Sequence, residues 1–92
     1  MSGQTKVLFD SEERMDRSEV AQMLREFADR VETGEVELRR GEQSVTATIP
    51  PSVVLEVKLE QKDRPGRAAK HSLEIELEWV EGDEGRGGLS LG

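Results

Sequence analysis

The chain has 92 residues, with 20 acidic and 13 basic side chains and a net charge of −7 at pH 7. This length fits one small domain and excludes large enzymes that join a nucleotide-binding domain to a substrate domain. The sequence contains no cysteine, which excludes disulfides, thiolate nucleophiles and cysteine-ligated metal centres. It also has no apolar run long enough for a membrane-spanning helix.

The first part of the chain is expected to form a strand and then a helix. The short apolar run at residues 6–10 predicts the strand. Asp16 and Glu19 have the spacing of a helix-capping box, and Gly34 is typical of a left-handed helix end. We therefore predict a helix over residues 17–33. Apolar residues recur between these signals at helical spacing, at Val20, Met23, Leu24, Phe27 and Val31.

After the helix the apolar period changes from 3.6 to 2, which predicts strands. Residues 40–43 (RGEQ) have the glycine position of a two-residue type II′ hairpin turn. This turn would pair Leu38 with Val45 and Val36 with Ala47. Apolar side chains of the two strands would then share one face of the sheet.

Two longer amphipathic strands are expected after Pro50 and Pro51, which end the preceding strand because proline cannot donate to a ladder. Residues 63–70 (DRPGRAAK) are expected to join the two strands as a loop. The apolar positions are Val53, Leu55, Val57 and Leu59 in one strand and Leu73, Ile75, Leu77 and Trp79 in the other.

These elements predict an α+β fold in which one helix packs on a mostly antiparallel sheet of about five strands, in the order β-α-β-β-β-β. Helix and sheet each have one apolar face, and no other part of the chain would cover either one. We therefore expect a two-layer sandwich. The single domain is expected over residues 6–81, after a flexible N-terminus at residues 1–5. Residues 82–92 are rich in glycine and are expected to be disordered.

The order of these segments resembles the amphi-Trp domain family. The resemblance rests on residues 18–25 (SEVAQMLR), 34–38 (GEVEL), 53–57 (VVLEV) and 73–79 (LEIELEW), and it extends over residues 7–81. It implies a small acidic fold that is frequent in salt-adapted microbes. The family brings no established activity and no assigned site residues, so the resemblance leaves the function open.

Residues that could carry catalysis are few. His71 is the only histidine, and we expect it to be solvated at the start of a strand. Residues 88–92 (GLSLG) match the spacing of a nucleophile elbow, but that motif needs a strand before it and a helix after it, and here the flanking sequence is rich in glycine. We therefore expect no catalytic residues and no cofactor.

Three carboxylates, Glu74, Glu76 and Glu78, share one face of the last strand. A carboxylate ladder that binds divalent ions is one interpretation. The interpretation we favour is a solvated sheet face, with Lys58 and Arg39 as cross-strand partners. We therefore expect no metal site.

Positive charge is concentrated in two stretches of an otherwise acidic chain. The expected loop at 62–70 carries +3 and the pair Arg39 and Arg40 carries +2, which leaves −12 on the rest. A basic loop on an acidic body suits an anionic partner, such as phosphate, nucleic acid or an acidic protein surface. A loop that is basic only for solubility is the alternative. The candidate anion-binding residues are Arg39, Arg40, Lys62, Arg64, Arg67 and Lys70.

Trp79 ends the apolar row of its strand, so we expect it in the core, and contact with a partner at the rim of the sheet is the alternative. The lack of a nucleophile–base pair and the exposed edges of a small sheet favour a non-catalytic protein-interaction module. Its partner would be another protein or a second copy of this chain. Anion or nucleic-acid binding through the basic stretches is the alternative function, although the net charge of −7 opposes binding to nucleic acid or to a membrane.

The composition also bears on the environment of the protein. A lysine-poor acidic surface and only three aromatic residues favour a salt-adapted source, because concentrated salt strengthens apolar burial. The start of the sequence has no basic region followed by an apolar stretch, so we expect a cytoplasmic protein without a signal peptide.

Overall fold

The computed structural model describes residues 3–82, which form one helix and two antiparallel hairpins. The chain divides between Ile49 and Pro50 into two compact units, called here unit 1 and unit 2. Unit 1 contains the helix and the first hairpin, and unit 2 contains the second hairpin. The elements are α1 (Arg17–Thr33), β1 (Glu35–Arg40), β2 (Gln43–Thr48), β3 (Val54–Arg64) and β4 (Arg67–Glu78).

Helix α1 begins and ends where the sequence signals place it. Asp16 is the N-cap, and its backbone N–H donates to Oε1 of Glu19 at 3.4 Å, as in a capping box. Gly34 follows the helix with φ 91°, a left-handed conformation that glycine adopts without steric cost. The Gly34 N–H donates to the carbonyl oxygens of Arg30 and Val31, both at 3.1 Å, which satisfies two carbonyls of the last turn.

The first hairpin has the predicted register. Leu38 lies opposite Val45, and Val36 lies opposite Ala47. Gly41, in the turn, has φ 61°, the positive value that a type II′ turn requires at this position. The predicted turn and register of β1 and β2 are therefore confirmed.

Unit 1 has its core where α1 packs on β1. Val36 is 6% exposed and is the one buried side chain among residues 3–82. The predicted apolar row of α1 is correctly placed, but its members remain about two-fifths exposed, except for the better covered Val31. A two-stranded sheet is too narrow to cover a helix face of five turns, and the expected fully enclosed core is not found in unit 1.

The predicted strand at residues 6–10 is wrong. This segment has no strand or helix in the structure, and side chains of the first hairpin bind its backbone instead. Gln43 Nε2 donates to the carbonyl of Leu8 at 3.2 Å, and Arg40 Nη1 donates to the carbonyl of Asp10 at 3.0 Å. These bonds satisfy backbone carbonyls one at a time, so no ladder is needed to hold the segment.

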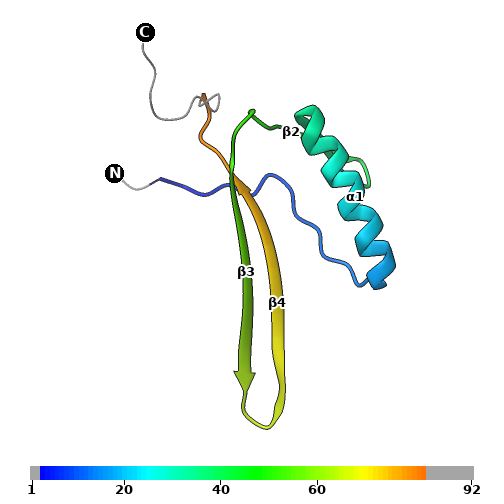
Figure 1. Ribbon diagram of the computed structural model, residues 1–92, viewed down its shortest axis with the longest axis vertical. Helices are drawn as coiled ribbons and strands as arrows, with labels where there is room; N and C mark the ends of the chain where they lie inside the picture. Colours follow the sequence, from blue (N-terminus) through cyan, green and yellow to red (C-terminus); the bar gives the residue numbers. More distant parts are fainter. Residues whose placement is uncertain (1–2, 83–92) are drawn as a thin grey trace. The chain divides into compact units, whose positions relative to one another are not determined.

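Unit 2 is a long hairpin in which strands β3 and β4 face each other over almost their full length (Figure 1). The connection is only two residues, Pro65 and Gly66, and not the loop over 63–70 that was predicted. Gly66 has φ 69°, and proline before it suits a type II turn. The basic residues are part of the ladder. Arg64 lies opposite Arg67 next to the turn, and Lys62 lies opposite Lys70 on the other side of a bulge between Lys62 and Arg64.

The described part of the chain therefore has an α+β fold, as predicted, but its sheet differs from the prediction. Residues 3–82 contain four strands rather than five, and these form two separate two-stranded sheets. The two-layer arrangement is present only in unit 1, where α1 packs on β1. The extent of the domain over residues 6–81 stays a prediction. Residues 83–92, which include most of the expected disordered tail, lie outside the described residues, as does the GLSLG motif.

Candidate functional site

The β3–β4 hairpin carries an apolar row that its own unit leaves uncovered. The register sets Leu55 opposite Leu77, Val57 opposite Ile75 and Leu59 opposite Leu73. Strand alternation places all six on one face, and all six are exposed, with Leu59 at 73% and Leu73 at 67%. We call this face the apolar row, and its residues are Leu55, Val57, Leu59, Leu73, Ile75 and Leu77.

Trp79 lies just beyond the end of β4, next along the same alternation. It is 39% exposed, so the structure does not enclose it in a core as the sequence predicted. Indole rings in such half-covered positions are common at protein interfaces, because one part is apolar and the N–H can reach a polar partner.

The opposite face of the hairpin is charged, and its charges are unevenly distributed. Near the tip, Lys62 lies opposite Lys70, and near the open end Glu56 lies opposite Glu76. Like charges at directly opposed positions destabilise a sheet, typically by several tenths of a kcal/mol. Only Lys58, opposite Glu74, has the opposed charge that was expected for this face.

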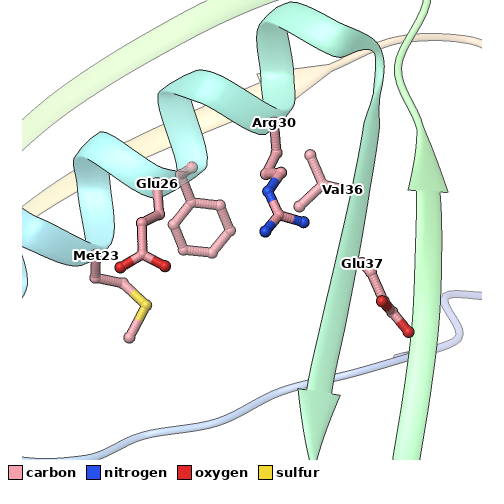
Figure 2. Close-up of a pocket in the computed structure, with 6 residues that line it drawn as sticks. Met23, Glu26, Arg30, Val36 and Glu37 are labelled. Atoms are coloured by element: carbon pink, nitrogen blue, oxygen red, sulfur yellow. The ribbon is translucent and has the colours of Figure 1, made fainter.

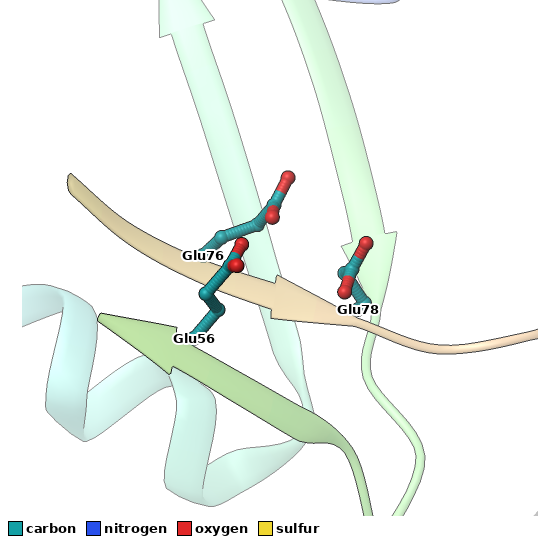
Figure 3. Close-up of side chains that lie close together, drawn as sticks. All are labelled: Glu56, Glu76 and Glu78. Carbon is teal, nitrogen blue, oxygen red and sulfur yellow. The ribbon is translucent and has the colours of Figure 1, made fainter. Parts of the chain in front are cut away.

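Three carboxylates gather at the open end of this face (Figure 3). Carboxylate oxygens of Glu56, Glu76 and Glu78 lie within 4.8 Å of one another, so Glu56 of the neighbouring strand takes the place that Glu74 had in the predicted ladder. A hydrogen bond with Glu56 raises the pKa of Glu76, and the charge of Glu78 raises it further. Three carboxylates could bind a hard divalent ion, but all are exposed, as in a solvated acidic surface.

The six candidate anion-binding residues are divided between the two units. The hairpin places Lys62 opposite Lys70 and Arg64 opposite Arg67, which brings four of them together at its tip. Arg64 Nε donates to the carbonyl of Ala68 at 2.8 Å, which ties one guanidinium to the backbone. The tip is therefore a small basic cluster, referred to here as the basic tip.

The other two candidates belong to unit 1 and have acidic partners there. Arg39 Nε lies 3.1 Å from Oε2 of Glu37, and Arg40 Nη1 lies 3.9 Å from Oδ1 of Asp10. The sequence paired Arg39 with the carboxylates of the last strand, whereas the ion pair found in the structure is with Glu37 on the same strand. Ser44 also donates to Glu37 at 2.7 Å, and the bonds from Ser44 and Arg39 lower the pKa of Glu37.

Unit 1 has two open pockets along the helix. A small one of about 130 Å³ is lined by side chains of α1, including Met23 and Arg30, and by Val36 and Glu37 of β1 (Figure 2). A wider groove of about 640 Å³ runs from this side of α1 to the segment before the helix, where Phe9 and Met15 contribute apolar surface. Sequence reasoning missed both, because the small pocket depends on how α1 packs on β1 and the wider groove also depends on where the irregular segment before the helix lies.

His71 lies opposite Gln61 on the hairpin and is exposed. Its neighbour Ser72 points to the other face of the strand, because side chains alternate along β4. Adjacent serine and histidine in one strand thus cannot form a nucleophile–base pair by themselves.

No helix of the described residues is long and apolar enough to cross a membrane. The family model of the Amphi-Trp domain matches residues 2–92. The chain therefore belongs to the Amphi-Trp domain family, and the resemblance inferred from its sequence is confirmed. No curated protein and no solved structure matches the chain.

Proposed function

We propose that this amphi-Trp domain protein is a small, non-catalytic protein-interaction module whose contact element is the β3–β4 hairpin. The observation that carries the proposal is the apolar row, six aliphatic side chains on one face of a hairpin with no second layer in its own unit. An isolated two-stranded hairpin is at best marginally stable in water. A contiguous apolar surface of this kind is typical of a contact with another surface.

The charged face supports the same proposal, because it limits where contact can occur. Burial of the like-charge pairs on this face would cost free energy, whereas burial of the apolar row would be favourable. We propose a salt-adapted cytoplasm as the setting, because concentrated salt would strengthen burial of the row and weaken repulsion on the charged face.

The test compares a pair of serine substitutions in the apolar row with a single serine substitution outside it. Leu59→Ser with Leu73→Ser removes the two most exposed members of the apolar row, which face each other across the hairpin. Val7→Ser is the control, because Val7 is 71% exposed and belongs to unit 1. Association is measured by sedimentation equilibrium and by retention of proteins from a native lysate, both in molar KCl.

We expect the wild type and the Val7→Ser variant to associate, with themselves or with a retained protein, and the double variant to lose that association. A wild type that stays monomeric and retains nothing beyond what the double variant retains would contradict the proposal. Circular dichroism of the helix checks that unit 1 is folded in every variant.

Anion binding at the basic tip is the second candidate function. The structure gives it one specific support, because Lys62 and Lys70 are held face to face at a cost that an anion would relieve. Titration with a single-stranded oligonucleotide should show affinity that falls with salt by roughly one log unit per log of salt for each phosphate contact. Lys62→Gln with Lys70→Gln should abolish it, and Arg39→Gln with Arg40→Gln should not. Absence of binding at low salt would end this alternative.

A further inference from the structure

The unpaired edges of the β3–β4 hairpin point to a particular partner. Within unit 2 each of these strands pairs only with the other, so each has one outer edge whose backbone groups find no partner inside this unit. On the basis of the proposed interaction function, we propose that β3 pairs edge to edge, antiparallel, with β3 of a second copy, with Leu59 opposite Leu59. The result would be a four-stranded sheet with two-fold symmetry.

The charge pattern of β3 sets this register. Its polar face alternates in sign along the strand, through Glu56, Lys58, Glu60 and Lys62. An antiparallel pair centred on Leu59 places Lys62 opposite Glu56 of the second copy and Lys58 opposite Glu60 of the second copy. Two-fold symmetry produces each of these contacts twice. Each of the four charged residues on this stretch of β3 would therefore lie opposite a residue of opposite charge in the second copy.

The same register also compensates the like charges inside each hairpin. Glu56 faces Glu76 within its own hairpin, and it would gain Lys62 of the second copy on its free side. Lys62 faces Lys70 within its own hairpin, and it would gain Glu56 of the second copy. A row across the sheet would therefore read Glu, Glu, Lys, Lys in place of two isolated repulsive pairs.

The edge of β4 fits less well by the same criterion. An antiparallel pair of two β4 strands centred on Leu73 would place Lys70 opposite Glu76 of the second copy, and symmetry would produce this contact twice. Its next pair would be Glu74 with Ser72, which have no opposite charges, whereas β3 has Lys58 with Glu60. The β3 edge therefore offers twice as many complementary contacts.

Backbone hydrogen bonds would supply most of the affinity of such a pair, and the charges would select its register. The proposed register pairs odd-numbered residues of one β3 with odd-numbered residues of the other. Because the apolar row occupies odd positions, the apolar residues of both copies would lie on the same face of the sheet. The apolar row of each hairpin would thereby become half of a wider apolar face, which meets the requirement of three or more strands for a stable sheet.

Single cysteine substitutions test the register directly, because the chain has no cysteine of its own. Leu59→Cys would place two cysteines opposite each other on the symmetry axis, where Cα atoms are about 4.5–5.5 Å apart and a disulfide can form. Val57→Cys is the matched control on the same face, because its two copies would be about 14 Å apart, beyond disulfide reach. Leu73→Cys reports on the β4 edge in the same way.

We expect the full-length Leu59→Cys variant to form a disulfide-linked dimer about tenfold or more faster than the other two under mild oxidation. Faster linkage of Leu73→Cys would overturn the assignment to β3. Equal rates for all three would overturn a fixed register.

Charge reversal at the seam gives an independent test. Glu60→Lys and Lys58→Glu each place like charges opposite each other in a homodimer, so each should weaken self-association about five- to tenfold at low salt. A mixture of the two variants restores both opposed pairs and should form a heterodimer of wild-type affinity. The mixture leaves the pairs inside each hairpin as they are in the single variants, so rescue cannot come from refolding. Failure of the mixture to rescue would contradict the register.

Failure of this inference can be told apart from failure of the proposed function. A chain that stays monomeric, but still retains another protein in a manner that requires Leu59 and Leu73, would overturn the second copy as partner and leave the interaction module in place. A chain that neither self-associates nor retains a protein would overturn both.

Discussion

The two units of this protein contain hairpins of opposite character. The β1–β2 hairpin is short and only weakly amphipathic, yet it holds Val36, which α1 covers. The β3–β4 hairpin has strands of 11 and 12 residues and regular alternation, yet every member of its apolar row is exposed. Alternation fixes which face of a strand is apolar, but burial requires a second layer of structure. The stronger sequence pattern therefore belongs to the unit with the weaker core.

The largest expected effect comes from one charge placed in each hairpin. Val36→Asp puts a carboxylate beneath α1 in place of the buried apolar side chain, and it should destabilise unit 1 by about 3 kcal/mol, because the carboxylate loses its hydration and the apolar contacts of Val36 are lost, although Arg30 lines the same pocket. Val57→Asp places the same charge on the apolar row, where the side chain is already 62% exposed. It should leave the helical signal and its urea midpoint nearly unchanged.

Urea titrations followed by circular dichroism at 222 nm measure both variants. A similar loss of helical stability for Val57→Asp would erase the difference between the two units. It would mean that the apolar row is as well covered in solution as Val36.

A smaller loss of stability is expected on substitution of one positive-φ glycine in each unit, Gly34 at the end of α1 and Gly66 in the turn of the second hairpin. Gly34→Ala should cost about 1–2 kcal/mol, because φ is 91° and a left-handed conformation is unfavourable for alanine. Its new Cβ would lie 3.6 Å from the carbonyl oxygen of Ile49, an ordinary contact that adds little. Gly66→Ala has a similar backbone cost, at φ 69°, but in unit 2. Thermal unfolding of the helix should shift for the first variant and not for the second, and a shift for both would show that the units unfold together.

Salt should stabilise the protein well beyond the range of charge screening. We expect urea midpoints to rise with KCl past 1 M, because salting-out strengthens apolar burial after screening has saturated. The variant with both Leu59→Ser and Leu73→Ser tests whether the apolar row is responsible. If it is, the urea midpoint of this variant should rise less steeply with KCl above 1 M than that of the wild type. A plateau below about 0.5 M in the wild type would instead indicate a protein from a moderate-salt cytosol.

The smallest expected effects are pH-dependent and have opposite signs in the two units. The pKa of Glu37 is lowered in unit 1, so its stabilising contribution is present above the unfolded value near 4.5 and is lost as pH falls through the folded pKa. The pKa of Glu76 is raised in unit 2, so stability falls as pH rises from about 4.5 through its folded pKa.

At pH 7, Glu37→Gln should therefore lower stability slightly and Glu76→Gln should raise it slightly. Both differences should vanish in acid, where both carboxyls are protonated. Side-chain NMR titration gives the two pKa values directly, and a Glu76 value at or below 4.5 would contradict the carboxylate cluster at the open end of the hairpin. Both side chains are in contact with solvent, so screening by salt should reduce both effects.

Parts of the candidate site were predictable from sequence, and the reasons differ from one part to another. The apolar row follows from period-two alternation at Leu55 to Leu59 and at Leu73 to Leu77, which needs no tertiary information. The basic tip was found as a cluster but assigned to a loop, because its segment contains proline and glycine, which are depleted in strands. The tight turn at Pro65 and Gly66 outweighs that propensity by holding the strands in register.

Other parts could not have been predicted. Glu56 joins Glu76 and Glu78 only through the register of two strands, which brings residues 20 positions apart to opposed sites. The ion pair of Arg39 with Glu37 also depends on strand pairing, because Ser44 of β2 lies opposite Arg39 and donates to the same carboxylate. Sequence distance and net charge contain neither fact.

The sequence by itself determined the local structure of this protein. Capping residues set the bounds of α1, the turn glycines set the hairpins, and alternation set the face of every strand. These signals act between residues close in the chain, where geometry leaves few choices. Only the tertiary structure decided which apolar faces are covered within each unit and that residues 6–10 form no strand. These outcomes depend on contacts between segments that are far apart in the sequence. An apolar pattern predicts that a face will be buried, but it does not specify which other surface will cover that face.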